Sequence, residues 1–322
     1  MADATYTGQA KVYKKQGGNE LVVAAGGLLT IEGVVTGFSP GTNFFVSSVA
    51  GSSSNDGLSW ATAKATLAQA LALCTASKND RIFLAPDHAE SVGAAGLAWN
   101  VAGVSIIGVG NGSNRPTFTW HTTDAVVTVS ADNVLITNVV TAVDLDEVVS
   151  MFLVSGAQVT FDGVDFGMAG TGSAAQAIQW LKTTAGADGI KIRNCRHRQL
   201  TAANSAQKWI ELVGPDFAEI TDCIFQIVAN ASTSSELISG STAVIYCVIA
   251  RNLIEFIGAT IDSVINLVTG STGIIADNRI ASGTSVATAA VITGDGCFVF
   301  NNLWADSAAA SGLLAPTVDS DT

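Results

Sequence analysis

The chain contains 322 residues, and its 15 Lys and Arg against 27 Asp and Glu give it a net charge of −12. Hydrophobic residues make up 48% of the sequence and charged residues only 13%, so the chain can bury a large core and is not disordered as a whole. Its negative charge repels phosphate groups, which argues against a nucleic-acid partner. No apolar stretch approaches the roughly twenty residues of a membrane-spanning helix, so no membrane partner is expected.

The first 37 residues contain short β-prone stretches separated by glycine pairs, with three basic residues near the start. They hold too little apolar surface to fold alone. We predict that residues 1–37 form a β-rich attachment arm, with a disordered tail as the alternative. The residues expected to bind the partner are Lys11, Val12, Tyr13, Lys14, Lys15, Leu21, Val22 and Val23.

Residues 38–80 are predicted to contain a linker followed by a short helix from Ser59 to Cys74. Ser59 is a suitable N-cap residue, and Leu67 and Leu71 lie one helical turn apart on the same face as Cys74. An open first coil of a β-structure would leave unpaired backbone groups at its edge. We therefore expect this helix to cap the first coil.

Residues 81–305 contain a repeat in which two apolar residues at i and i+2 precede an Asn, Asp or Gly. The segment Ile190, Ile192, Asn194 is one example, and the pattern recurs with a mean spacing of 27 residues. A period of two indicates β-strands, and two or three short strands in such a unit are typical of one coil of a parallel β-helix. A propeller blade would need four strands in about 40–45 residues.

The repeat therefore predicts an all-β fold, a right-handed parallel β-helix of about nine coils over residues 81–305. The polar tail at residues 306–322 is expected to be flexible. Asn at a corner tolerates unusual backbone angles and can bond to the Asn of the next coil. The residues predicted to form such a structural ladder are Asn138, Asn194, Asp222, Asn252, Asn278 and Asn302.

The outward positions of this register are charged in the middle coils and apolar in the last ones. Ile249, Ile275 and Val299 would form an apolar stripe on the outer face. A stacked row of exposed apolar residues indicates a covered surface. We predict a subunit interface at these three residues, with a side loop of the same chain as the alternative cover.

Few residues point to catalysis by carboxylates. Asp162 and Asp165 are expected to form structural ion pairs with Arg193 and Arg196 of the next coil. The basic segment 191–198 either grips an acidic sugar or capsid surface, or is a solvated outer strand. The six Trp are spread along the chain without a cluster that would indicate a sugar-binding cleft.

Other polar groups also have structural explanations. His88 between Asp87 and Glu90 is expected to close a coil by hydrogen bonds, and the acidic loop 144–147 is expected to be solvated rather than to bind Ca²⁺. The five Cys show no C-x-x-C spacing and are expected to be free thiols. We therefore predict no catalytic residue, no metal site and no cofactor.

Two segments carry a resemblance to a known family. Gly51–Trp60 and Asp80–Glu90, with the helix between them, resemble the opening of pectate-lyase-like right-handed β-helix proteins of tailed bacteriophages. The arm at Gln9–Thr36 is similar to the start of short phage structural proteins encoded near the capsid genes. The resemblance covers about residues 45–305 and implies a tailspike, head fibre or capsid decoration protein, usually a homotrimer.

On this resemblance we expect a structural protein of the phage virion, of the capsid decoration, cement or head-fibre type. Its expected partners are the phage major capsid protein and further copies of itself in a homotrimer. It would be assembled in the host cytoplasm and lie on the capsid surface. The alternative is a short tailspike or receptor-binding protein that binds or cleaves bacterial surface polysaccharide.

Overall fold

The computed structural model describes residues 12–14, 21–23, 41–145, 148–167, 179–198, 208–229, 236–258, 263–282, 291–294, 296–306 and 311–313. The chain divides into two compact units, Met1–Pro40 and Gly41–Thr322. In the first unit, β1 (Val12–Lys14) pairs antiparallel with β2 (Leu21–Val23). The boundary lies close to the predicted end of the attachment arm.

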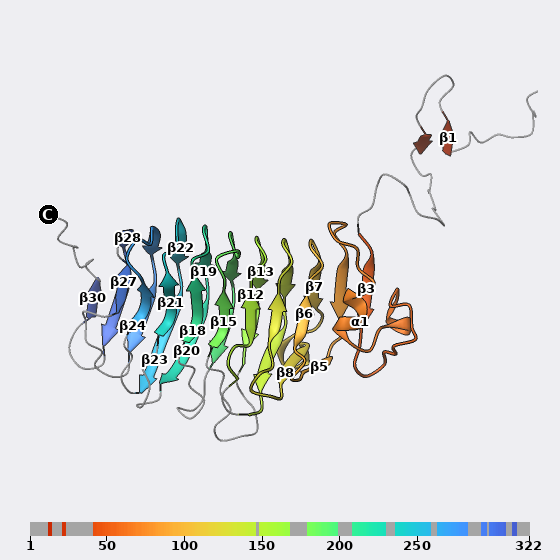
Figure 1. The fold of residues 1–322 in the computed structure, drawn as a ribbon, viewed down its shortest axis with the longest axis horizontal. Helices are drawn as coiled ribbons and strands as arrows, with labels where there is room; N and C mark the ends of the chain where they lie inside the picture. The colour runs from red at the N-terminus through yellow and green to blue at the C-terminus, as the bar shows by residue number, and fades with distance from the viewer. Residues whose placement is uncertain are drawn as a thin grey trace, which may run out of the picture. The chain divides into compact units, whose positions relative to one another are not determined.

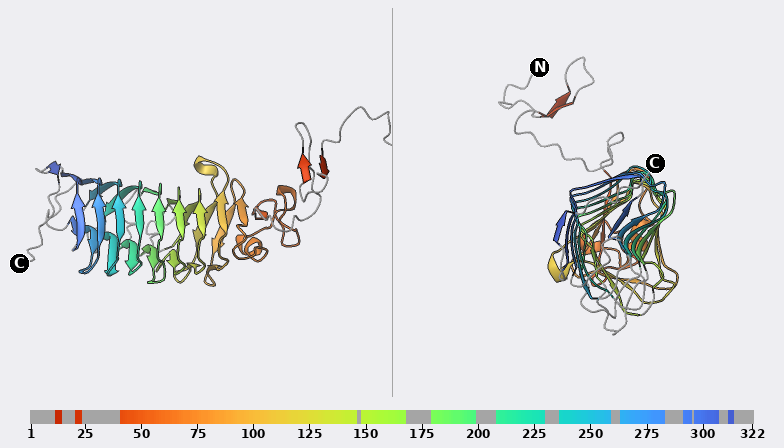
Figure 2. Two further views of the ribbon diagram at one scale, coloured as in Figure 1. Left: turned by 90° about the horizontal axis from the view of Figure 1, so that it is seen from above. Right: turned by 90° about the vertical axis from the view of Figure 1, so that its left-hand side faces the viewer.

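The second unit is a β-helix built from three sheets of parallel strands, so the predicted fold class is confirmed (Figure 1). We number the three sheets I, II and III in the order in which the chain first enters them. Successive coils add one strand to each sheet in turn, and the end-on view shows the sheets as the walls of one solenoid (Figure 2). Crossovers between parallel strands strongly favour right-handed winding.

The strands of each sheet follow one another coil by coil. Sheet I contains β3 (Asn43–Val46), β4 (Arg81–Leu84), β7 (Ser105–Gly108), β10 (Leu135–Thr137), β13 (Thr160–Asp162), β16 (Lys191–Arg193), β19 (Glu219–Thr221), β22 (Cys247–Ala250), β25 (Gly273–Ala276) and β28 (Cys297–Phe300). Sheet II contains β5 (Ala89–Val92), β8 (Thr117–Trp120), β11 (Val140–Val143), β14 (Asp165–Phe166), β17 (Arg196–Arg198), β20 (Ile224–Ala229), β23 (Leu253–Gly258), β26 (Arg279–Ser282), β29 (Leu303–Asp306) and the antiparallel β30 (Ser311–Leu313). Sheet III contains β6 (Leu97–Trp99), β9 (Val127–Val129), β12 (Phe152–Val154), β15 (Gln179–Thr183), β18 (Lys208–Val213), β21 (Glu236–Thr242), β24 (Ser263–Leu267) and β27 (Ile292–Gly294).

The ends of the solenoid differ from the prediction. β3 pairs with β4, so the parallel stack begins inside the segment assigned as a linker. The predicted helix is wrong in extent. Two short helices, η1 (Trp60–Thr62) and α1 (Leu67–Leu71), lie on either side of a β-bridge to Lys64, and α1 packs against β3, β4 and β6. A further 3₁₀ turn, η2, covers Gly112–Asn114. At the other end, β30 pairs with β29 inside the tail that was expected to be flexible.

The core lies between the three sheets and is apolar in every coil. In sheet I every strand contributes an inward residue to one column, and the register joins these residues directly from coil to coil. The column consists of Phe44, Ile82, Ile106, Ile136, Phe161, Ile192, Ile220, Ile249, Ile275 and Val299. Stacked aliphatic side chains remove apolar surface from water in each successive coil.

The placement of Ile249, Ile275 and Val299 on the outer face is therefore wrong. Ile249 and Ile275 are fully buried, and Val299 is partly buried against the core. In β22 all four residues are apolar, so no alternation of polar and apolar residues shows which side chains face the core. A shift of one residue in the assignment exchanges the inner and outer faces.

The predicted polar ladder is real only in the last three coils. The amide of Asn252 donates to Asn278 Oδ1 at 3.0 Å, and the amide of Asn278 donates to Asn302 Oδ1 at 2.9 Å. All three side chains are buried. Each amide also bonds to a strand carbonyl of the preceding coil, as Asn278 does to Ile249 at 3.0 Å. The ladder thus satisfies buried polar groups that would otherwise be costly.

The other three predicted ladder residues occupy a different position. Asn138, Asn194 and Asp222 have positive φ at the corner between sheets I and II, with side chains at the surface or half-buried. Their backbone N–H groups donate to a carbonyl of the next coil, as Asn194 N does to Thr221 O. The left-handed conformation aims this N–H along the stack, and Asn and Asp tolerate it.

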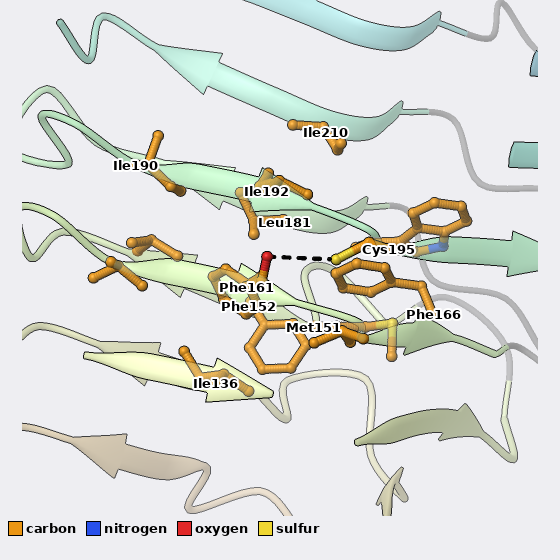
Figure 3. Packing of buried hydrophobic residues seen from close by; sticks show 14 of the residues in the cluster. Ile136, Met151, Phe152, Phe161, Phe166, Leu181, Ile190, Ile192, Cys195 and Ile210 are labelled. Carbon is orange, nitrogen blue, oxygen red and sulfur yellow. Dashed lines mark hydrogen bonds between the residues drawn. The ribbon is translucent and has the colours of Figure 1, made fainter. Parts of the chain in front are cut away.

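Aromatic side chains fill the central coils (Figure 3). Phe152 lies at ring distances of 5.2 Å from Phe161, 5.4 Å from Trp120 and 5.9 Å from Trp99. Four of the six Trp are fully buried in this core, so these four form no exposed sugar-binding cluster, as predicted. Three cysteines are buried, and Cys195 Sγ donates to the Phe161 carbonyl at 3.6 Å, as Figure 3 shows. All five cysteines are present as thiols, as expected.

Candidate functional site

The attachment residues predicted in the first unit are described only in part. Val12–Lys14 and Leu21–Val23 form the hairpin of β1 and β2, with Tyr13 opposite Val22. Lys11 and Lys15 lie outside the described residues. The structure therefore places six of the eight predicted residues on one small two-stranded sheet.

An exposed apolar column does lie on the outer face of sheet I, one residue away from the predicted positions. Val248, Ile274 and Phe298 are register partners in consecutive strands. Val248 is half-buried, while Ile274 is 39% and Phe298 is 76% exposed. Phe300 follows on the same strand and is 50% exposed. These four residues are called the outer apolar column below.

The acidic residues considered for catalysis are held in ion pairs. Asp162 bonds to Arg193 Nε at 3.0 Å. Asp165 Oδ2 accepts from Arg115 and from Arg196, each at 2.7 Å. A carboxylate shared by two guanidinium groups is acceptor-only and fully engaged, so this corner has the expected structural role.

A further ion pair joins corner residues of two later coils. Arg251 makes a bidentate contact with Asp222, at 2.8 and 2.7 Å. Both residues occupy the same left-handed corner position in adjacent coils. The Arg251 guanidinium lowers the pKa of Asp222 below its ordinary value, through the hydrogen bonds first and then its charge.

His88 closes the first coil, as expected. Its Nδ1 accepts the N–H of Ser48 at 2.9 Å, so Nε2 carries the proton and donates to Glu90 Oε2 at 2.9 Å. Glu90 also accepts the N–H of Leu67 at 2.9 Å, which fixes the start of α1. Because both ring nitrogens are engaged and the ring is buried, His88 has no free site for a substrate proton.

A cluster of charged side chains lies on sheet III. Glu211 is almost buried, and Lys182 Nζ contacts it at 2.9 Å while Gln179 donates to the same oxygen. Lys208 lies 3.4 Å from Glu211 and 3.8 Å from Glu236. Burial raises the pKa of Glu211, but the hydrogen bonds from Lys182 and Gln179 and the two Lys charges outweigh it, so the pKa lies below the ordinary value.

Two exposed aromatic rings stack at the corner between sheets III and I. The rings of Phe217 and Tyr246 lie 5.2 Å apart with an interplanar angle of 24°. The side chains are 57% and 62% exposed. Sequence reasoning missed this pair, although each residue stands directly before two buried apolar residues at alternate positions, Ala218 and Ile220 or Cys247 and Ile249.

The backbone conformation of this aromatic pair is unusual. Phe217 and Tyr246 both have φ of 58°. The equivalent corner positions of other coils are held by residues that tolerate positive φ, among them Gly103, Asn133 and Gly189. A bulky residue in this region is strained, and strain of this kind gathers at functional positions.

The described residues contain no group of three or more His, Cys, Asp or Glu side chains placed to hold a metal ion. The predicted acidic loop contributes only Asp144 and Leu145, since residues 146–147 lie outside the described part. Within the part of the chain that the structure covers, no helix has the length and apolarity needed to cross a membrane.

No protein-family model matches the chain, and no curated protein does. Among solved structures, a rhamnogalacturonan lyase is similar over 81% of this chain and 87% of that chain, with 12% sequence identity and a TM-score of 0.44. At this identity the likeness concerns the fold alone.

Proposed function

We propose that this chain is a structural protein of a bacteriophage particle that decorates or stabilises the capsid. The observation that carries the proposal is the division of the chain into a small unit, Met1–Pro40, and a self-contained β-helix. A separate unit with a basic hairpin fits an anchor, and a β-helix fits a rigid protrusion. Binding of the anchor across capsid subunits would stabilise the shell, because a ligand that binds only the assembled state shifts the equilibrium toward it.

The outer apolar column also supports the proposal, because it suits self-association. The outer apolar column exposes aromatic and aliphatic side chains in consecutive coils, and a stacked apolar surface of this kind favours a protein partner. Further copies of the chain, arranged as a homotrimer, would cover these side chains and add avidity at a three-fold position.

The proposal is tested by the binding of purified protein to capsids that lack it. We expect the full chain to sediment with the particles, and a chain without residues 1–40 to remain folded but unbound. Lys11→Ala, Lys14→Ala and Lys15→Ala together should weaken binding, whereas Lys78→Ala on the β-helix should not. Decoration by the truncated chain would contradict the proposal.

Polysaccharide binding is the second candidate function, and the Phe217–Tyr246 pair favours it. Flat, exposed aromatic faces pack against the C–H faces of sugar rings, and the aromatic quadrupole attracts the partial positive charge there. Two parallel rings on adjacent coils present this surface at the outside of the β-helix.

The test of this second function is binding to an array of bacterial polysaccharides. We expect Phe217→Ala with Tyr246→Ala to abolish binding, and Phe298→Ala, which removes an equally exposed ring elsewhere, to preserve it. Equal binding by the wild type, the Phe217→Ala and Tyr246→Ala double variant and Phe298→Ala would contradict this candidate function.

A further inference from the structure

Three side chains from consecutive coils meet on the outer side of sheet II. Ser91 belongs to β5, His121 follows β8 directly, and Asp144 follows β11 directly. His121 Nδ1 lies 2.6 Å from Asp144 Oδ2, and His121 Nε2 lies 3.4 Å from Ser91 Oγ. The fold therefore aligns a hydroxyl, an imidazole and a carboxylate in one chain of contacts.

The register of sheet II creates this alignment. Val143 pairs with Trp120, so the next residues, Asp144 and His121, stand opposite each other, and the Asp144 N–H donates to the Trp120 carbonyl. Ser91 pairs with Thr119, two residues before His121, so its hydroxyl reaches the ring diagonally. The side chains of Ser91, His121 and Asp144 are all exposed.

The contacts also fix the tautomer of His121. An ionised carboxylate can only accept, so the proton of the neutral ring lies on Nδ1 and is donated to Asp144. The lone pair of Nε2 then faces the Ser91 hydroxyl, as a general base requires. His88 is the contrast within the same chain, because its Nδ1 accepts a backbone N–H and its Nε2–H is donated to Glu90.

We propose that Ser91, His121 and Asp144 form a site that hydrolyses O-acyl esters. This arrangement has the roles of a nucleophile, a base and a group that orients the base, and such triads are identified by geometry rather than by sequence order. The separation of 3.4 Å between Ser91 and His121 is in the range of unliganded sites. This inference goes beyond a structural role and differs from the absence of catalytic residues predicted from the sequence.

The reaction proceeds in two balanced steps. Ser91 Oγ attacks the acyl carbon while its proton passes to His121 Nε2, and the C–O bond to the alcohol breaks as the alcohol takes that proton. Water then attacks the acyl-serine, gives one proton to His121 and releases the carboxylic acid as Ser91 recovers its proton. Asp144 touches neither reactant and is a positioning residue.

The exposure of the site selects the class of ester. The His121 side chain is 41% and the Asp144 side chain 37% exposed, so the reacting ester must project toward a convex surface. Small acyl groups on the hydroxyls of a polysaccharide project in this way. This choice of substrate rests on the second candidate function, whereas the chemistry of the site does not.

The chemistry is tested without any glycan. The full-length protein is treated with a fluorophosphonate probe, which phosphonylates an activated serine with release of fluoride, and the modified peptide is identified by mass spectrometry. Hydrolysis of p-nitrophenyl acetate is measured in parallel. We expect Ser91 to be modified and both readouts to be lost in Ser91→Ala and to fall about 100-fold or more in His121→Ala.

Two further variants separate the roles of the neighbours. Thr119→Ala removes the hydroxyl that pairs with Ser91 in the next strand, and it should leave both rates unchanged. Asp144→Asn should slow modification at least about tenfold, and Asp144→Glu should recover part of the rate because it restores the acceptor for Nδ1. Circular dichroism verifies that each variant is folded, which is expected because Ser91, His121 and Asp144 are exposed.

An unmodified Ser91, or hydrolysis by Ser91→Ala at the wild-type rate, would overturn the proposal, since an exposed imidazole alone would then explain the activity. Release of acetate from an O-acetylated polysaccharide tests the substrate separately. Loss of that release in the variant carrying Phe217→Ala and Tyr246→Ala, with p-nitrophenyl acetate hydrolysis intact, would support the polysaccharide as substrate. Acetate release at the wild-type rate in that variant would overturn the link to the aromatic pair.

Discussion

Single residues at the corners of the β-helix are selected mainly by their backbone conformation. Many left-handed residues donate their N–H to a carbonyl of the next coil, as Asn133 does to Ala157 and Phe217 does to Ile245. Gly and Asn adopt this conformation at low cost, whereas other side chains cost roughly 1–2 kcal/mol. The aromatic residues at two of these corners therefore carry this cost, as Gln158 and Arg251 do at others.

The strain at Phe217 can be measured directly. Phe217→Gly removes the strain together with the ring, whereas Phe217→Ala removes the ring and keeps the strain. We expect Phe217→Gly to be more stable than Phe217→Ala by about 1 kcal/mol in urea unfolding. Equal stabilities would mean that the corner relaxes and that the backbone does not constrain position 217.

Glu211 shows how a nearly buried carboxylate depends on its neighbours. Its folded-state pKa is below the ordinary value, so it contributes stability above the unfolded pKa of about 4.5 and loses it as the pH falls through the folded value. Glu211→Gln removes the charge that Lys182 and Lys208 face.

We expect Glu211→Gln to lower the free energy of unfolding by about 1–3 kcal/mol at pH 7 and by much less at pH 3. Chemical denaturation at the two pH values measures this difference. Glu255→Gln, on the exposed face of sheet II, is the control and should have little effect at either pH. A loss that is the same at both pH values would show that packing, and not charge, explains the effect.

At the scale of the strand, the sequence predicts which segments form strands, but it does not always predict which side chains of a strand face the core. In β16 the alternation of Lys191, Ile192 and Arg193 assigns the inner residue unambiguously. In β22 four consecutive apolar residues fit either face, and the prediction that Ile249 faces outward shifted the last three coils by one position. The Ser91 triad and the Phe217–Tyr246 pair depend on register between coils, which is why neither could be found from local patterns.

The polar ladder is an element whose stability depends on its continuity. Asn278 donates to Asn302 and Ile249 and accepts from both the side chain and the N–H of Asn252. Asn278→Ala leaves several buried groups without partners, so we expect a loss of at least about 2 kcal/mol in unfolding free energy.

Asn194→Gly is the matched control for the ladder. Asn194 occupies the exposed left-handed corner, where glycine is well tolerated, and its amide bonds to the surface residue Asp162 at 2.9 Å. We expect this change to cost less than about 1 kcal/mol. A larger loss for Asn194→Gly than for Asn278→Ala would contradict the division of these residues into a corner position and a buried ladder.

At the scale of the whole molecule, the phase of the last coils decides which residues are buried in the core and which are exposed on the outer face of sheet I. Ile249 is fully buried in the inner column, so Ile249→Asp places an uncompensated charge in the core, and we expect loss of soluble folded protein. Phe298 is 76% exposed, so Phe298→Asp should fold normally. Light scattering should then report a trimer for the wild type and a monomer for Phe298→Asp.

Val49→Asp provides the control for this last experiment, because it changes another exposed apolar residue that follows β3, at the opposite end of sheet I from the outer apolar column. It should leave the trimer intact, so that only charge within the column disrupts assembly. If Ile249→Asp folds and Phe298→Asp does not, the inner and outer faces of the last coils are assigned the wrong way round. The interface would then lie at Ile249, Ile275 and Val299, as predicted from the sequence. A wild-type monomer would contradict the proposed homotrimer.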